Sequence, residues 1–347
     1  MRSARLPALL LVAALASGAV GLPSAPADEA SGGDPVIATV GDMVCHRGPQ
    51  EGPNRNIKKY GECVYDKVSD LVVEGDYDAF LALGDLQYLR GALDRFNRYY
   101  DPAYGRVKDI TYPVPGNHEY YTFEHGRWGD GYYRYFGQAA HPPRGYYSFD
   151  VGDWHVVALN SQLCKEKSWL PRVQYVRGLP GDGCRPGDPQ YEWLKRDLAA
   201  HPNTEYACTL AYMHHPLFKW SYWPIRKTDR VQRPLWRLLR TAGADVVLAG
   251  HWHNYQRFEP INTRGEPSDK GMAEFIVGTG GDFYNPLPTE EAGAYGGEQP
   301  KPEGLAAADW GTHGILEMTL HPDSYDYRFI TAEGEEPFED SGSAECR

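Results

Sequence analysis

Five short apolar stretches of this chain each lead into side chains of the kinds that bind metal ions. Each stretch is predicted to be a strand, and the polar side chains stand just beyond its last residue. The pairs are Val36–Val40 with Asp42, Ala79–Leu83 with Asp85 and Tyr88, Ile110–Val114 with Asn117 and His118, Thr209–Met213 with His214, and Val246–Ala249 with His251 and His253. Because ligands bind beyond the carboxyl ends of strands in α/β sheets, we expect these side chains to converge there. Glycines beside them permit sharp turns and close approach.

The donor types predict a site for two transition-metal ions. Carboxylate, amide and imidazole donors without a thiolate suit first-row divalent or trivalent cations. Two Asp, one Asn and three His are more donors than one tetrahedral ion takes. A pair of ions that shares a carboxylate accommodates them all. Such pairs, about 4 Å apart, activate water and clamp the attacking and leaving oxygens of a phosphoryl group.

The remaining apolar patterns predict the elements that hold these groups in place. Two helices are indicated, Pro189–Ala200 and Arg230–Ala242. Asp188 stands where it can cap the first helix, and Gly243 where it can end the second. Because helices alternate with short apolar strands, we predict an α/β fold. The other predicted strands are His155–Leu159, Glu274–Val277 and a closing hairpin of Gly314–Leu320 and Tyr325–Ile330.

Two long segments, 119–147 and 164–188, show no clear periodicity and are predicted to be loops that wall the site. Tyrosines gather in the first segment, at positions Tyr120, Tyr121, Tyr132, Tyr133 and Tyr135. Their rings either pack within the loop or form an aromatic wall for an apolar leaving group.

The composition is that of an acidic globular protein. Of 347 residues, 47 are Asp or Glu and 35 are Lys or Arg, which gives a formal net charge of −12. Because nucleic-acid phosphates are held mainly by Lys and Arg, we predict no nucleic-acid binding.

Residues 1–27 are predicted to be a secretory signal peptide. Arg2 and Arg5 precede the apolar run Leu6–Val20, and Ala25-Pro26-Ala27 fits a cleavage site. The run is too short to span a bilayer comfortably, and a retained membrane anchor is the alternative. Residues 28–347 are expected to form a single domain that is secreted and has no membrane anchor after cleavage.

The six cysteines are predicted to form disulfide bonds, because the chain is predicted to be exported and contains no Cys-x-x-Cys pair of a zinc knuckle. Sequence alone does not choose among the pairings. We expect Cys45–Cys63 and Cys164–Cys184, which close short loops, and Cys208–Cys346, which ties the C-terminal tail to the body.

The order of the motifs resembles that of one enzyme family, the calcineurin-like metallophosphoesterases. The matching blocks are Gly41-Asp42, Gly84-Asp85 with Tyr88, Gly116-Asn117-His118-Glu119, Met213-His214-His215-Pro216 and Gly250-His251 with His253. The second block, with Tyr88 three residues after Asp85, resembles that of the purple acid phosphatase branch. The resemblance implies a two-sheet α/β/β/α sandwich of the metallophosphoesterase type. Plant-type purple enzymes also carry an N-terminal β domain, which we expect this chain to lack.

The resemblance also implies roles for eight residues of these blocks. Asp85 would bridge the two ions, and His118 would lie beside them, steadying the transition state or protonating the leaving oxygen. The first ion would be held by Asp42, Tyr88 and His253, and the second by Asn117, His214 and His251. His215 follows a predicted ligand on a strand, so we expect its side chain on the opposite face, where it would support a ligand or the fold.

One position departs from the family's pattern and leaves the ligands of the first ion open. Most members have His two residues after the first Asp, and the purple enzymes have Gly, whereas this chain has Val44. Tyr88 is the natural replacement. Because tyrosine ionises near pH 10, its binding at neutral pH needs a strongly acidic cation. We therefore expect Fe(III) with a divalent Fe, Zn or Mn ion if Tyr88 binds, and two divalent ions otherwise.

The predicted function is that of a metal-dependent, acid phosphatase-like phosphoric ester hydrolase. It would hydrolyse small phosphomonoesters by in-line attack of metal-bound hydroxide. Two alternatives remain: a phosphodiesterase acting on nucleotides or lipid headgroups, and a non-catalytic, metal-stabilised binding protein. Tyr255 and Arg257, just past the last block, and His125, in the aromatic segment, are candidates for substrate contacts, with plain packing as the alternative.

Overall fold

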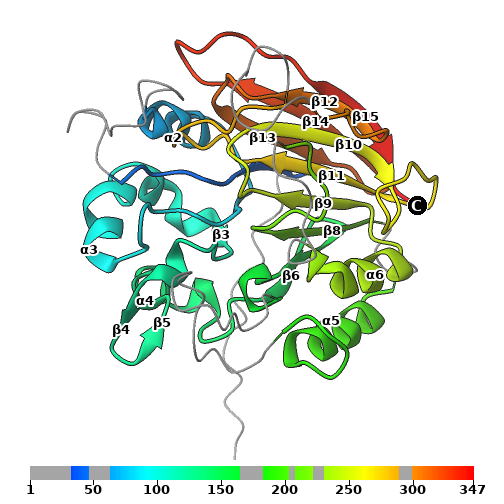
Figure 1. The fold of residues 1–347 in the computed structure, drawn as a ribbon, viewed down its shortest axis with the longest axis horizontal. Coiled ribbons are helices and arrows are strands. Elements are labelled where there is room, and N and C mark those ends of the chain that lie inside the picture. Colours follow the sequence, from blue (N-terminus) through cyan, green and yellow to red (C-terminus); the bar gives the residue numbers. More distant parts are fainter. Residues whose placement is uncertain (1–32, 47–62, 165–182, 203–207, 222–229, 289–298) are drawn as a thin grey trace, which may run out of the picture. The chain divides into compact units, whose positions relative to one another are not determined.

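Two β-sheets pack against each other and are covered by helices on their outer faces (Figure 1). The computed structural model describes residues 33–46, 63–164, 183–202, 208–221, 230–288 and 299–347. The helices and strands lie within one unit of residues 34–347.

The first sheet has six strands, and its parallel half carries three of the predicted motifs. Strands β1, β2 and β3 run parallel, and β13 pairs with β1 in the antiparallel direction. Their order across the sheet is β15 (Ser341–Glu345), β14 (Ser324–Thr331), β13 (Gly314–Leu320), β1 (Val36–Val40), β2 (Ala79–Ala82) and β3 (Thr111–Pro113).

The second sheet has seven strands, and its four central strands are parallel. These buried strands are rich in Val, Ile, Leu and Ala, as strands covered on both faces should be. The order is β12 (Leu305–Asp309), β10 (Tyr255–Ile261), β11 (Met272–Val277), β9 (Val246–Ala249), β8 (Cys208–Met213), β7 (Trp154–Ala158) and β6 (Tyr147–Val151).

Aromatic side chains fill the space between the sheets. The rings of Phe275 and Tyr327 lie 5.2 Å apart, and those of Tyr255 and Phe329 lie 4.9 Å apart. On the outer face of the second sheet, α5 (Pro189–Ala200) and α6 (Arg233–Ala242) bury Leu, Trp and strand side chains in a separate cluster. On the first sheet, α2 (Tyr65–Glu74) packs against β13. The predicted α/β/β/α layering is therefore confirmed.

Most predicted elements are present, with shifts of one to a few residues at their ends. The second helix begins at Arg233 rather than Arg230, because Pro234 belongs in a first helical turn, where its missing N–H costs no hydrogen bond. Gly243 ends this helix with φ 90°, as expected. Asp188 occupies the N-cap position of α5, but its carboxylate accepts the Arg185 N–H (2.8 Å) instead of capping the helix.

The segment 119–147 is not an irregular loop, which corrects the prediction. It forms η3 (Glu119–Tyr121), the hairpin β4 (Phe123–Glu124) and β5 (Arg127–Trp128), α4 (Asp130–Phe136) and η4 (Gly137–Ala140). Packing of α4 rings against Phe96 and Tyr100, rather than an apolar periodicity, holds the segment in place. Most of the other predicted loop, residues 165–182, lies outside the described residues.

The three expected disulfides, Cys45–Cys63, Cys164–Cys184 and Cys208–Cys346, are all formed. Within the described ranges, no helix is both long and apolar enough to cross a bilayer. The predicted signal peptide lies outside the described residues.

The structure also contains elements that the sequence patterns did not indicate. These include the short helical segments α3 (Leu93–Arg95), η1 (Phe96–Tyr100), η2 (Tyr104–Ile110) and η5 (Ser161–Cys164).

Candidate metal centre

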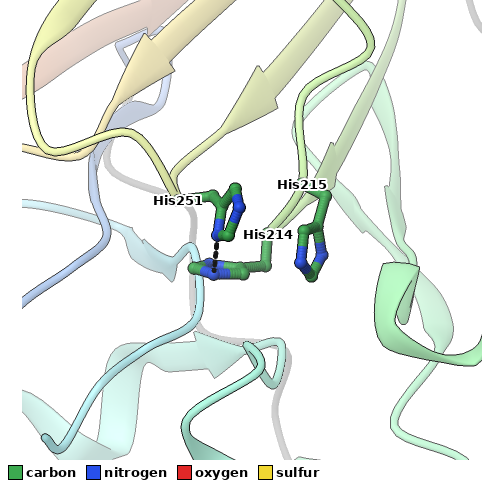
Figure 2. Close-up of side chains that lie close together, drawn as sticks. All are labelled: His214, His215 and His251. Atoms are coloured by element: carbon green, nitrogen blue, oxygen red, sulfur yellow. Dashed lines mark hydrogen bonds between the residues drawn. The ribbon is translucent and has the colours of Figure 1, made fainter. Parts of the chain in front are cut away.

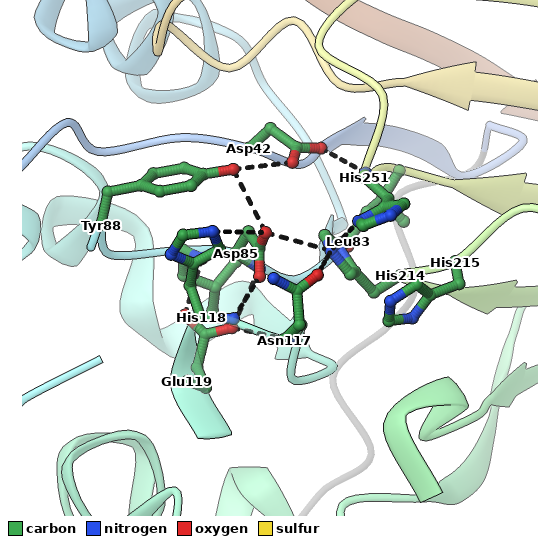
Figure 3. A network of polar contacts seen from close by, with 12 residues as sticks. Asp42, Leu83, Asp85, Tyr88, Asn117, His118, Glu119, His214, His215 and His251 are labelled. Atoms are coloured by element: carbon green, nitrogen blue, oxygen red, sulfur yellow. Dashed lines mark hydrogen bonds and ion pairs between the residues drawn. The ribbon is translucent and has the colours of Figure 1, made fainter. Parts of the chain in front are cut away.

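The predicted metal ligands come together beyond the carboxyl ends of strands from both sheets (Figure 3). The first sheet supplies residues that follow β1, β2 and β3, and the second sheet supplies residues that follow β8 and β9. In chain order the assembled residues are Asp42, Asp85, Tyr88, Asn117, His118, His214, His251 and His253.

Three of the predicted ligands turn the backbone at their own positions. The φ angle is 58° at Asp42, 50° at Asp85 and 72° at His251, a left-handed conformation that few residues with a side chain adopt. Glycines leave the space that these side chains occupy. A Cβ on Gly116 would lie 2.1 Å from Asp85 Oδ1, and one on Gly250 would lie 2.6 Å from Asp42 Oδ2. The glycines in the motifs therefore serve close approach more than turning.

Tyr88 Oη is the centre of a first group of donors. It lies 2.8 Å from Asp42 Oδ1, 3.2 Å from Asp85 Oδ2 and 2.9 Å from His253 Nε2. Adjacent ligands of a cation with bonds of about 2.0–2.2 Å stand roughly 3 Å apart. These four atoms therefore have the spacing of ligands around one cation.

His214 Nε2 is the centre of a second group. It lies 3.2 Å from Asp85 Oδ2, 3.3 Å from Asn117 Oδ1 and 3.2 Å from His251 Nδ1. Figure 2 shows how the rings of His214 and His251 meet. The other ring nitrogen, His214 Nδ1, donates to the Leu83 carbonyl (2.9 Å), which directs Nε2 toward the group. Asp85 Oδ2 belongs to both groups.

A buried carboxylate, Glu119, holds the loops that follow β2 and β3. Its Oε2 accepts the N–H groups of Asp85 (2.9 Å) and Gly116 (2.7 Å). Its Oε1 accepts those of Leu86 (2.9 Å) and Gln87 (3.3 Å). Sequence reasoning gave Glu119 no role. Its position inside a motif, next to two functional side chains, was the available signal.

Burial governs the charges of the centre. It raises the pKa of Asp42 to about 7 and, together with Asp42 and Asp85, raises the pKa of Tyr88 well above its usual value. Burial also disfavours the charged form of Asp85, but His214 and His118 hold the pKa of that carboxyl below its usual range. Cations would compensate these buried acidic groups. Donor type, spacing and charge therefore fit two metal ions.

His118 lies beside the ligands. Its backbone N–H donates to Asp85 Oδ1 (2.8 Å), and its ring Nδ1 donates to the Leu89 carbonyl (2.6 Å). The remaining ring nitrogen, Nε2, lies 3.9 Å from Asp85 Oδ2. It is therefore directed toward the shared carboxylate.

A comparison with protein families supports the same assignment as the motifs. The family model described as calcineurin-like phosphoesterase matches residues 35–255 of the chain. The chain belongs to the calcineurin-like phosphoesterase family. Its expected resemblance to the purple acid phosphatase branch is confirmed by its curated relatives.

Purple acid phosphatase 21 of Arabidopsis thaliana is 28% identical over 226 residues, which are 61% of this phosphoesterase-family chain and 46% of that protein. Purple acid phosphatase 22 of the same plant is 29% identical over 224 residues, or 60% and 45% of the two chains. The chain thus spans about half the length of these relatives.

Solved structures share the fold of this calcineurin-like chain. A purple acid phosphatase from yellow lupin (Lupinus luteus) superposes with a TM-score of 0.60 at 15% identity. The match covers 90% of this chain and 53% of the lupin chain. A dimetal phosphatase from Danio rerio superposes with a TM-score of 0.57 at 15% identity. The match covers 90% of this chain and 100% of the Danio rerio chain. At this identity the likeness shows the fold alone.

Val44, the position that departs from the expected motif pattern, is fully buried. The Val44 N–H donates to the Leu86 carbonyl (3.1 Å), so the position joins the first two motif loops. The hydrogen-bond distance between Tyr88 Oη and Asp42 puts the phenol among the donors of the first group.

His215 does not point to the opposite face, so that expectation was wrong. Its ring lies 4.8 Å from the His214 ring and 4.3 Å from the His251 ring (Figure 2). Its Nδ1 is 2.8 Å from Ser161 Oγ. The strand β8 ends at Met213, so the alternation of a strand no longer applies at His215.

The three candidates for substrate contacts are not brought into either group of donors. Tyr255 Oη donates to Asp340 Oδ2 (2.7 Å), and Arg257 binds both oxygens of the same carboxylate at 2.8 and 3.0 Å. Because Asp340 already engages this guanidinium, the expectation that Arg257 positions phosphate is not supported. His125 lies on the exposed turn between β4 and β5, and its Nδ1 is 2.9 Å from Asp130 Oδ2.

Proposed function

We propose that this chain is an exported phosphoesterase that works with two metal ions and hydrolyses phosphomonoesters. The observation that carries the proposal is the position of Asp85 Oδ2, 3.2 Å from Tyr88 Oη and 3.2 Å from His214 Nε2. One carboxylate oxygen that belongs to two groups of donors suits a pair of ions better than a single ion. Membership of the phosphoesterase family and the purple acid phosphatase relatives support the same chemistry.

Each ion would have its own ligands. The first would be held by Asp42, Tyr88 and His253, the second by Asn117, His214 and His251, and both by Asp85. When bound, such a pair supplies Lewis acidity and an activated water for in-line attack at phosphorus. The pair is Fe(III) with a divalent Fe, Zn or Mn ion if Tyr88 binds as a phenolate, and two divalent ions if it does not.

His118 would act on the departing group. Because its Nδ1–H is held by the Leu89 carbonyl, Nε2 is the ring nitrogen left to face the centre. From that position it can donate a hydrogen bond to a phosphoryl oxygen or pass a proton to the leaving oxygen. The bond from its backbone N–H to Asp85 Oδ1 holds the residue beside the shared carboxylate.

The test is elemental analysis of the purified chain, with residues 1–27 removed, alongside a hydrolysis assay. We expect two equivalents of transition metal and faster hydrolysis of p-nitrophenyl phosphate than of bis-p-nitrophenyl phosphate. The reverse preference would replace the monoesterase by the phosphodiesterase alternative. A chain that holds both metals but is inert on every phosphoester would be the non-catalytic binding protein. A chain that takes up only traces of metal would contradict the proposal altogether.

Export is supported by the cysteines. All three disulfides are formed and no cysteine remains free, a state that persists in oxidising compartments. Mass analysis of the protein from culture medium would test both export and cleavage, with a mature N-terminus at Asp28 as the expected result.

A further inference from the structure

Tyr121 touches two functional side chains at once, although it belongs to neither group of donors. It lies at the end of η3, four residues after Asn117. Its Oη accepts a hydrogen bond from Asn117 Nδ2 at 3.1 Å. Its ring centroid lies 4.7 Å from that of His118, with the two planes inclined by 57°.

The hydroxyl anchors the Asn117 amide while the amide oxygen faces the second group of donors. An amide side chain can bind a cation through its oxygen, whereas its NH₂ group is a donor of hydrogen bonds only. Because Tyr121 Oη accepts from Nδ2, the oxygen Oδ1 is turned toward His214 Nε2, 3.3 Å away. Without this partner, rotation of the amide would present the NH₂ group to the ion.

The ring confines His118 from one side. The His118 ring also packs against the ring of Tyr88, with centroids 4.3 Å apart. Only one ring nitrogen, Nδ1, is anchored, through the Leu89 carbonyl. A single hydrogen bond leaves the ring free to pivot about it, so the two tyrosine rings are what fix the direction of Nε2.

We propose that Tyr121 is a positioning residue that serves the second metal ion and His118 together: its hydroxyl orients the Asn117 amide and its ring orients His118. This proposal rests on the proposed dinuclear function. Neighbouring tyrosines differ. Tyr132 Oη donates to the Pro113 carbonyl (3.0 Å) and Tyr135 Oη to Asp101 (2.6 Å), and both pack among other rings. For those two residues the packing interpretation of the tyrosine cluster holds.

Two variants separate the contributions of hydroxyl and ring. Tyr121→Phe removes only the hydroxyl, and Tyr121→Leu removes both. Tyr135→Phe is the matched control, because it deletes a hydroxyl from the same aromatic segment without touching Asn117 or His118. Apoprotein of each variant is titrated with Zn²⁺ against a competing chelator, and kcat is then measured across pH at saturating metal.

For Tyr121→Phe we expect the affinity for the second metal ion to fall about 10-fold. This is the lower end of the range for loss of a group that orients a ligand. Its pH profile at saturating metal should keep the shape of the wild type. Tyr121→Leu should show the same loss of affinity and, in addition, a lower kcat at saturating metal with a displaced pH profile. Tyr135→Phe should match the wild type in both measurements.

Wild-type affinity for both ions in Tyr121→Phe would overturn the role of the hydroxyl. A Tyr121→Leu protein with the kcat and pH profile of Tyr121→Phe would overturn the role of the ring. If Tyr121→Leu does not fold, the phenylalanine variant still decides the first point, and Tyr121→His, with its smaller ring, decides the second by the same kcat comparison. A wild type that binds two ions but hydrolyses nothing would refute the proposed function, while the Zn²⁺ titrations would still decide the role of the hydroxyl.

Discussion

Two clusters of histidine and carboxylate lie at opposite ends of the parallel strands of the second sheet, and they differ in how their ligand atoms are arranged. At the end of β8, His214 Nε2 meets Asp85, Asn117 and His251 at 3.2–3.3 Å. At the start of the neighbouring strand β7, His155 lies between Asp150 and Asp197.

The two clusters differ in the number of ligand atoms whose lone pairs converge on one point. Each ring nitrogen of His155 faces its own carboxylate, at 2.9 Å from Asp150 and 3.0 Å from Asp197. A ring that donates through both nitrogens can therefore pair with both carboxylates. Around His214, three donors from different loops surround one nitrogen. Convergence of several lone pairs on one point therefore favours the His214 cluster as a metal site. Proximity of His and Asp side chains alone does not indicate one.

The largest effect is expected from Asp85→Ala, with Asp197→Ala as the matched change in the other cluster. Asp85→Ala removes the shared oxygen, so both ions should be lost and turnover should fall by more than the ~10³-fold that removal of one electrostatic group costs. Asp197→Ala should keep both ions and most of the turnover, with a lower melting temperature. Elemental analysis and hydrolysis of p-nitrophenyl phosphate measure both. Equal metal content in the two variants would break the comparison.

The next effect concerns the residue beside the centre that binds no ion. His118→Ala should keep both metals and lower kcat by about 10²–10⁴-fold, the usual contribution of a positioned acid or base. The measurement is kcat at saturating substrate together with metal content. Concurrent loss of metal would mean that His118 belongs to the donors themselves.

Tyr88→Phe sharpens the description of the first group of donors. If the phenol binds Fe(III), the wild type should show a visible charge-transfer band that the variant lacks, and affinity for that ion should fall by about 10-fold. Absorption spectroscopy before and after substitution checks this. A colourless wild type that is fully active with Mn or Zn would contradict the phenolate and favour two divalent ions.

The smallest effect on activity is expected at the cluster of His155, Asp150 and Asp197. His155→Gln should leave metal content and kcat near wild type and cost about 1–3 kcal/mol of stability, the range for leaving a buried polar group, here the Asp197 carboxylate, unsatisfied. Denaturant unfolding followed by tryptophan fluorescence gives this value. A loss of metal here would show that the two clusters are not independent.

The pH dependence of that loss has a definite sign. Burial lowers the pKa of His155, but the bonds to Asp197 and Asp150 outweigh it and raise the pKa above the ordinary value of 6.5. The stabilisation is therefore complete below about pH 6.5 and is lost as the pH rises through the folded-state pKa. The difference in unfolding free energy between wild type and His155→Gln should be larger at pH 5.5 than at pH 9. An equal difference at both would mean that His155 is not charged.

The convergence of the predicted ligands could be anticipated because each follows a short apolar strand, and parallel strands bring their carboxyl ends to one edge. The strand β10 was missed because polar Gln256, Arg257 and Glu259 interrupt its apolar pattern. Strand β15, Ser-Gly-Ser-Ala-Glu, is a partly exposed edge strand without an apolar signal.

The side-chain partners were harder to predict than the ligands. Arg257 was expected near phosphate because it follows the last motif, but nothing in the sequence indicates that Asp340 would meet it. Likewise, the contact of Tyr121 with Asn117 depends on the turn of η3, and a run of tyrosines without periodicity gives no sign of it. Pairing across loops is decided by tertiary packing, which no local pattern records.

The four amide hydrogen bonds of Glu119 have a consequence for saturation mutagenesis. Even glutamine is a poor substitute, because its NH₂ group would meet backbone N–H groups head-on, whichever way the amide is turned. A mutational map of this protein would therefore show an intolerant position that neither a cation nor a substrate explains. Intolerance to replacement there would report the cost of leaving main-chain donors without acceptors.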